Sequence, residues 1–124
     1  MAEPLDIAAI QAQLRQFVGE REWDRFHTPK NLVMALSGEV GELTELFQWL
    51  SEEESWRIMD AAESAQAVRD EIADVLMYLL RIADVLGVDP APAVQAKMRK
   101  NAAKYPVEHW RGKARKYTEP DRSS

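Results

Sequence analysis

The sequence contains no cysteine, and only two of its 124 residues are histidine. Without cysteine the chain can form neither a disulfide nor a thiolate zinc site, and it has no cysteine nucleophile. Neither His27 nor His109 follows a glutamate by three positions. The paired Glu-x-x-His motifs of di-iron helical bundles are therefore absent, and redox iron is not expected.

Long apolar runs are also missing. The uninterrupted apolar stretches are too short to cross a bilayer, and the N-terminal stretch MAEPLDIAAIQ lacks the basic and apolar segments of a secretory signal. Together with the lack of cysteine, these features lead us to expect a cytoplasmic protein with no membrane partner.

Charge is distributed unevenly along the chain. Residues 1–96 hold 7 Lys and Arg against 18 Asp and Glu, a net charge of −11, whereas residues 97–124 hold 9 against 3, a net charge of +6. An acidic body with a basic end suggests a bound cation in one place and a gripped anion in another. The alternative is a solvated acidic surface with a basic tail.

Helical spacing of apolar residues dominates the chain, and repeats, Gly-rich loops and strand alternation are absent. Asp6, Thr28-Pro29 and Asp89-Pro90 are typical helix starts, and Gly87 is a typical helix end. These signals predict an all-α, four-helix-bundle-like domain over 1–109, followed by a polar, extended or mobile tail over 110–124. Its expected helices cover 7–22, 29–50, 67–86 and 90–104, and residues 51–66 form a connection with room for a short helix.

Two pairs of acidic residues lie beside the apolar stripes of the predicted helices. Glu39 and Glu42 share one helix face, and Glu71 and Asp74 repeat the same spacing on another. Antiparallel packing would bring these four carboxylates together, where repulsion and desolvation oppose their ionisation. A hard divalent cation, Mg²⁺ or Mn²⁺, would relieve that cost.

Two glycines accompany the first acidic pair. Gly38 and Gly41 each cost the helix about 1 kcal/mol relative to alanine, and their small size would leave room for a hydrated metal and a phosphate. Either acidic pair alone is ordinary for a solvated helix face. Metal binding is favoured by the conjunction of both pairs with the glycines.

The spacing Glu39-x-x-Glu42, 28 residues and Glu71-x-x-Asp74 resembles that of the all-α nucleoside triphosphate pyrophosphohydrolases, the MazG-like superfamily. The resemblance extends from about Leu14 to Glu119. It points to the dCTP pyrophosphatase branch, through the stretches REWDRFHTPKNLVMALSGEVGELTELFQWL, DEIADVLMYLL, KMRKNAAKYP and RKYTE.

The resemblance implies Mg²⁺-dependent hydrolysis of a nucleoside triphosphate, dCTP or a modified dCTP, to the monophosphate and pyrophosphate. Glu39, Glu42, Glu71 and Asp74 would bind the metal, and Glu39 or Glu42 would position or deprotonate the attacking water. The family also implies a homo-oligomer, a dimer or a dimer of dimers, with sites shared between subunits.

Family position further suggests substrate contacts on two parts of the chain. Phosphate and sugar would be bound by Lys97, Asn101, Lys104 and Tyr105, whose alternative is a solvated basic face. Base and sugar would be recognised by Trp23, His27, Asn31, Trp49 and Tyr78, whose alternative is packing in the core or an interface and, for His27, help in capping the second helix.

One position departs from the animal enzymes of this branch. A histidine of their first helix is expected to assist cytosine recognition, and Leu14 stands at the matching place, so the preferred base stays open. A different class of function is a non-enzymatic helical interaction module whose basic end binds an acidic partner. The acidic body argues against broad nucleic-acid binding.

Overall fold

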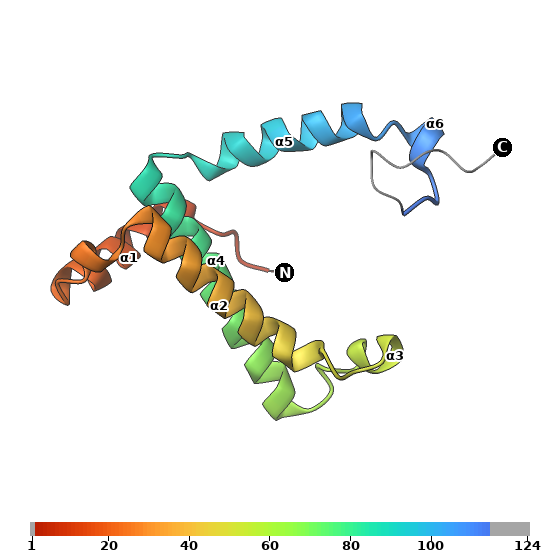
Figure 1. Cartoon of the computed structure of the whole chain (residues 1–124), viewed down its shortest axis with the longest axis horizontal. Coiled ribbons are helices and arrows are strands. Elements are labelled where there is room, and N and C mark those ends of the chain that lie inside the picture. Colours follow the sequence, from red (N-terminus) through yellow and green to blue (C-terminus); the bar gives the residue numbers. More distant parts are fainter. Residues whose placement is uncertain (1, 115–124) are drawn as a thin grey trace. The chain divides into compact units, whose positions relative to one another are not determined.

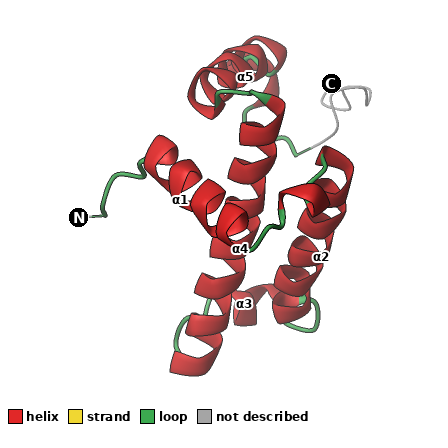
Figure 2. Cartoon of the chain, turned by 90° about the vertical axis from the view of Figure 1, so that its left-hand side faces the viewer, coloured by secondary structure: helices red, strands yellow, loops and turns green. Residues whose placement is uncertain are grey.

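The computed structural model describes residues 2–114, and every regular element in that range is helical (Figure 1). Figure 2 shows helices joined by loops, without a strand among the described residues. The all-α prediction is confirmed. No described helix combines the length and the apolar character that a membrane span requires. In chain order the elements are α1 (Ile7–Glu20), the 3₁₀ turn η1 (Asp24–Phe26), α2 (Pro29–Phe47), α3 (Glu52–Ser55), α4 (Ala62–Leu86), α5 (Pro90–Lys104) and α6 (Val107–Trp110).

The chain divides into two compact units, Met1–Val88 and Asp89–Ser124, and each is described by itself. The first unit contains α1 to α4, and the second contains α5 and α6. The predicted domain over 1–109 stays a prediction. Of the predicted tail, Trp110 ends α6, and residues 115–124 lie outside the described part of the chain.

The three helix starts expected from capping residues are confirmed by their hydrogen bonds. The Asp6 carboxylate accepts from the Ala9 amide at 3.0 Å, and the Thr28 hydroxyl accepts from the Asn31 amide at 3.2 Å. Asp89 caps α5 in the same way. Gly87 ends α4 with φ of 69°, a left-handed conformation that glycine adopts without steric cost.

Three helix boundaries differ from the prediction. α1 ends at Glu20 rather than at residue 22. α4 begins at Ala62, five residues before the expected start, because Ser64 donates to the carbonyls of Ile58 and Ala61 and Ala65 is buried against the core. The polar composition of residues 51–66 is the reason that the sequence analysis assigned the first five residues of α4 to a connection. α2 ends at Phe47 rather than Leu50, since Ser51 and Glu54 form a capping box that starts α3.

The core of the first unit forms where α4 packs against α2 and α1. Its buried apolar side chains are Val18 from α1, Leu32 from α2, and Ala65, Val68 and Leu80 from α4. Many large apolar side chains remain exposed on the same helices, including Met34 and Ile72, which are 64% and 53% exposed. The unit therefore buries only part of the apolar surface that its helices carry.

Candidate active site

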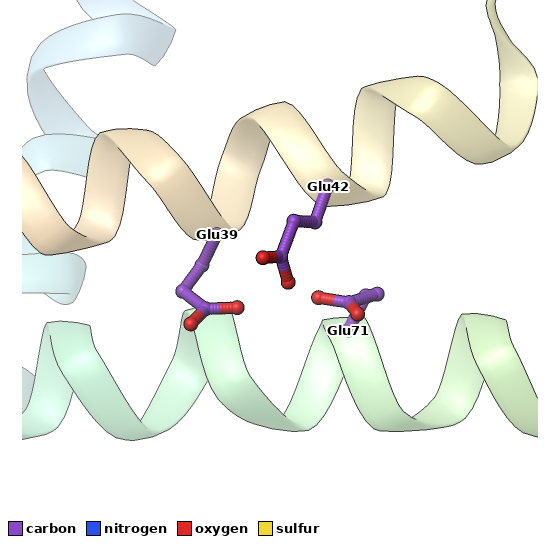
Figure 3. A group of neighbouring side chains, drawn as sticks. All are labelled: Glu39, Glu42 and Glu71. Carbon is purple, nitrogen blue, oxygen red and sulfur yellow. The ribbon is translucent and has the colours of Figure 1, made fainter.

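Three glutamates converge between α2 and α4. Glu39 and Glu42 extend from α2 and Glu71 extends from α4, so that their carboxylates meet in the space between the two helices (Figure 3). One oxygen from each lies within 4.8 Å of the others. Glu39 and Glu71 are half-buried, whereas Glu42 is exposed. We call these three residues the carboxylate cluster.

Asp74, the fourth acid predicted for the site, lies beside the cluster rather than in it. Its carboxylate is not among the three whose oxygens converge. It lines a cavity together with Glu39, and its negative charge contributes to the raised pKa of both Glu39 and Glu71. Asp74 is thus close enough to act on the cluster electrostatically.

The electrostatics of the cluster are unfavourable for the protein alone. Burial, followed by the charges of Glu42 and Asp74, raises the pKa of Glu39 to about 7. Burial and the neighbouring Glu42 also raise the pKa of Glu71. The Oε2 atoms of Glu39 and Glu71 are buried without a hydrogen-bond partner among the described residues. Buried, unpartnered carboxylate oxygens of like charge fit a hard, oxygen-preferring cation.

A cavity of about 340 Å³ adjoins the cluster, a volume within the range of small-molecule sites. We call it the Trp23 pocket. Two acidic residues, several apolar or aromatic ones and an arginine contribute to its walls: Glu39, Asp74, Leu14, Phe17, Trp23, His27, Met77, Tyr78 and Arg81. The pocket therefore combines aromatic surface with one member of the carboxylate cluster.

Trp23 is held in place by contacts from α1. Its backbone amide donates to the Val18 carbonyl at 3.0 Å, and its indole meets the Phe17 ring edge-on with centroids 5.8 Å apart. Glu22, with φ of 55°, turns the chain between α1 and η1. Trp23 stays 44% exposed, which leaves surface for stacking.

Arg81 is the charged residue of the pocket that the sequence prediction missed, and the apolar Phe17 and Met77 were missed as well. Its guanidinium is 3.3 Å from Asp24 Oδ1 and 3.6 Å from Asp84 Oδ2, and its Nε donates to His27 Nδ1 at 3.3 Å. The residue is only 8% exposed. A signal existed in the sequence, because Arg81 follows Tyr78 by three positions and Asp74 by seven and so shares their helix face.

The remaining predicted base contacts are not all gathered at the pocket. Tyr78 and His27 line it, and His27 bonds to Arg81 instead of capping α2. Asn31 does not line it, and its side-chain amide donates to the Phe26 carbonyl at 3.1 Å. Trp49 is 87% exposed just beyond α2 and does not line it either.

The predicted phosphate contacts belong to the second unit. Lys97, Asn101 and Lys104 lie on α5 at helical spacing, and all three are exposed. Tyr105 follows them at the helix end, where its ring meets that of Trp110 edge-on at 4.9 Å. Their sharing of one helix face agrees with the sequence prediction, and their phosphate-binding role stays a prediction.

Gly38 and Gly41 are not required for close approach of another part of the described chain. A Cβ added at either position would meet no atom within 4 Å. The expectation that they leave room for a metal and a phosphate stays a prediction.

Comparison with known proteins identifies the family. Residues 34–119 match the MazG-like family. This chain belongs to the MazG-like family. The matched segment contains the carboxylate cluster, Asp74 and the α5 cations, so the resemblance inferred from the acidic spacing is confirmed.

Named relatives of this MazG-like chain share a substrate in their names. It is 44% identical to dCTP pyrophosphatase 1 of Bos taurus over 92% of this chain and 66% of that protein. It is 44% identical to the Mus musculus protein of the same name over 96% of this chain and 68% of that protein. The match thus spans about two thirds of the length of these relatives.

A solved structure supports the MazG-like fold. The crystal structure of a pyrophosphatase from Archaeoglobus fulgidus superimposes with a TM-score of 0.76 at 41% sequence identity. The superposition covers 86% of this chain and 97% of the archaeal chain.

Proposed function

We propose that this MazG-like chain is a nucleoside triphosphate pyrophosphohydrolase that converts dCTP or a modified dCTP to the monophosphate and pyrophosphate. The observation that carries the proposal is the junction of the carboxylate cluster with the Trp23 pocket, since Glu39 belongs to both. A base held in the pocket would place its phosphates toward the acids. The names of the 44% identical relatives support the choice of dCTP.

The acids of the site suit Mg²⁺, with Mn²⁺ as a substitute. Glu39, Glu42 and Glu71 would hold the ion, and Asp74 would supply a further oxygen from the edge of the cluster. A bound cation lowers the pKa of water and neutralises charge that develops on the phosphates. Glu39 or Glu42 would position the attacking water or accept its proton.

Recognition of the base is assigned to the Trp23 pocket. Trp23 offers an aromatic face, and stacking of a base on such a face is worth about 1–3 kcal/mol in other nucleic-acid systems. Tyr78 and His27 line the same cavity. Leu14 also lines it and brings an apolar group where the animal enzymes are expected to have a histidine, so modified pyrimidines belong in any substrate panel.

Contacts to the phosphates and sugar are proposed for Lys97, Asn101, Lys104 and Tyr105. Cationic and amide groups at this helical spacing suit a polyphosphate chain. For Asn31 and Trp49 we keep the proposed role in substrate binding, in which Trp49 would act at the site of a neighbouring subunit. Its 87% exposure in the single chain leaves the indole available for such a contact.

A homo-oligomer, and specifically a tetramer, is proposed on the basis of exposed apolar surface. Between α2 and α4 runs a hollow of about 470 Å³ with an almost wholly apolar lining that includes Val40, Phe47 and Ile72. A second copy of the chain would cover this surface. Sedimentation velocity at micromolar concentration tests the assembly, and a monomeric profile would contradict it.

The proposed reaction is tested by incubating the protein with each of the four dNTPs and with 5-methyl and 5-halogenated dCTP in the presence of Mg²⁺. The expected products are monophosphate and pyrophosphate, formed fastest from a cytosine nucleotide. The expected loss of products on chelation tests the metal. Absence of products, with no nucleotide binding by calorimetry, would instead favour a non-enzymatic interaction module.

A further inference from the structure

We propose that Arg81 is a positioning residue that fixes His27 as the tautomer protonated at Nε2, so that His27 presents a neutral hydrogen-bond donor for a carbonyl oxygen of the base. This inference rests on the proposed function, because it adds a specificity determinant to the same pocket. Arg81 and His27 are 54 residues apart in the sequence and both line the Trp23 pocket.

The tautomer follows from the direction of the hydrogen bond. A guanidinium has only donors, so the bond from Arg81 Nε to His27 Nδ1, at 3.3 Å, requires an unprotonated Nδ1. A neutral imidazole with a bare Nδ1 carries its single proton on Nε2. Double protonation would turn Nδ1 into a donor and place a second positive charge against the guanidinium.

The guanidinium is held by acids on two elements, which fixes its direction. Asp24 of η1 and Asp84 of α4 lie 3.3 and 3.6 Å from its two terminal nitrogens. Asp84 is in turn held by Arg15 of α1, whose Nη1 lies 2.8 and 2.9 Å from its two carboxylate oxygens. With its terminal nitrogens engaged by aspartates, Arg81 directs the remaining Nε–H to His27.

The neutral state of His27 is supported by its surroundings. Burial and the charge of Arg81 lower its pKa, and the opposing effect of Asp24 is smaller. Glu39 and Asp74 also line the pocket. A neutral N–H donor beside the exposed face of Trp23 matches the chemistry of a nucleobase, which offers an aromatic face and carbonyl acceptors in one plane.

The first test determines the tautomer of His27 by NMR in the protein without nucleotide. In protein labelled with ¹⁵N-histidine, long-range proton–nitrogen correlation at neutral pH should show His27 protonated at Nε2 and bare at Nδ1. Arg81→Met should abolish this preference, while His109, the other histidine of the chain and a member of the second unit, should keep its signals. A wild-type His27 protonated at Nδ1, or at both nitrogens, would overturn the proposal.

The second test measures KM and kcat to determine whether Arg81 acts on substrate binding through His27. Arg81→Met should raise KM for dCTP about tenfold, the value of one lost hydrogen bond, with little change in kcat. In a His27→Phe background the same substitution should have little further effect, because the two residues act as one unit. Additive effects of the two substitutions on KM would contradict action through His27.

Two variants separate positioning from folding. Arg57→Gln breaks an exposed ion pair with Glu53 and involves no residue that lines the Trp23 pocket, so both the tautomer and KM should be retained. If Arg81→Met does not fold, Arg81→Lys keeps the charge but replaces the planar fork with one ammonium. Its donors sit on a single nitrogen, whereas the contacts to Asp84, Asp24 and His27 use three different nitrogens of the guanidinium. Arg81→Lys should likewise lose the tautomer preference. Failure of the wild type to hydrolyse any dNTP would overturn the proposed function, and the NMR result would still decide the state of His27.

Discussion

Helix α4 contributes to two groups of charged side chains that differ in how their charges are balanced. One is the carboxylate cluster, and the other is the set of ion pairs around Arg81. In the cluster, like charges converge and two buried oxygens have no partner among the described residues. Around Arg81, positive and negative groups alternate from Arg15 through Asp84 and Arg81 to Asp24. Unsatisfied charge marks a place for a ligand, whereas mutually paired charge orders the protein around that place.

The largest effect should come from removing a carboxylate of the cluster. Glu39→Gln or Glu71→Gln should reduce turnover about 100-fold or more, because each loses an oxygen proposed to bind the metal. Glu45→Gln is the matched control, since Glu45 is an exposed glutamate of α2 outside the cluster. Monophosphate production measured at saturating Mg²⁺ decides the point, and full activity of both cluster variants would refute the metal assignment.

The second effect concerns pH and stability in metal-free protein. The pKa of Glu39 is raised from 4.5 to about 7 on folding, so the folded state retains a proton that the unfolded state releases. The free energy of unfolding should therefore fall as pH rises from 4.5 to about 7. Urea titrations at several pH values measure the slope.

Two changes should reduce that pH dependence. Glu39→Gln should make the slope shallower because the glutamine has no proton to release, and the slope that is left belongs to Glu71, whose pKa burial and Glu42 also raise. Mg²⁺ should raise the melting temperature most above neutral pH, where Glu39 is ionised. A slope that is identical in the wild type and in Glu39→Gln would show that another group is responsible.

The third effect contrasts the two acids that hold Arg81. Asp84→Asn should lower the free energy of unfolding by about 1–2 kcal/mol, since Asp84 is only 20% exposed and pairs with both Arg15 and Arg81. Asp24→Asn should cost about 1 kcal/mol or less, because the Asp24 side chain is 66% exposed. Chemical denaturation measures both free energies of unfolding. Equal decreases for Asp84→Asn and Asp24→Asn would show that burial does not determine which ion pair contributes more to stability.

The smallest effect tests the glycines beside the cluster. Gly41→Ala should raise the free energy of unfolding by roughly 0.5–1 kcal/mol, because alanine is the better helix former and its Cβ meets nothing within 4 Å. If the glycine leaves room for metal and phosphate, turnover should fall although stability rises. Unchanged turnover in the stabilised variant would remove that explanation.

The sequence by itself determined the local features of this protein. These features follow from residues within a few positions of one another. They are the helix starts at Thr28 and Asp89, the helix end at Gly87, and the shared face of Glu39 and Glu42. Such features depend on backbone geometry and capping, which neighbours in the sequence control. The start of α4 was predicted wrongly because it depends on the hydrogen bond from the Ser64 hydroxyl to the Ile58 carbonyl and on the burial of Ala65.

Only the tertiary structure decided which of these residues meet. Packing of α4 against α2 brought Glu71 to Glu39 and Glu42 and left Asp74 at the edge. It also joined Arg81 to His27 across 54 residues. Helical periodicity assigns a side chain to a face, but the rotation and offset between packed helices decide which atoms on facing surfaces come within bonding distance.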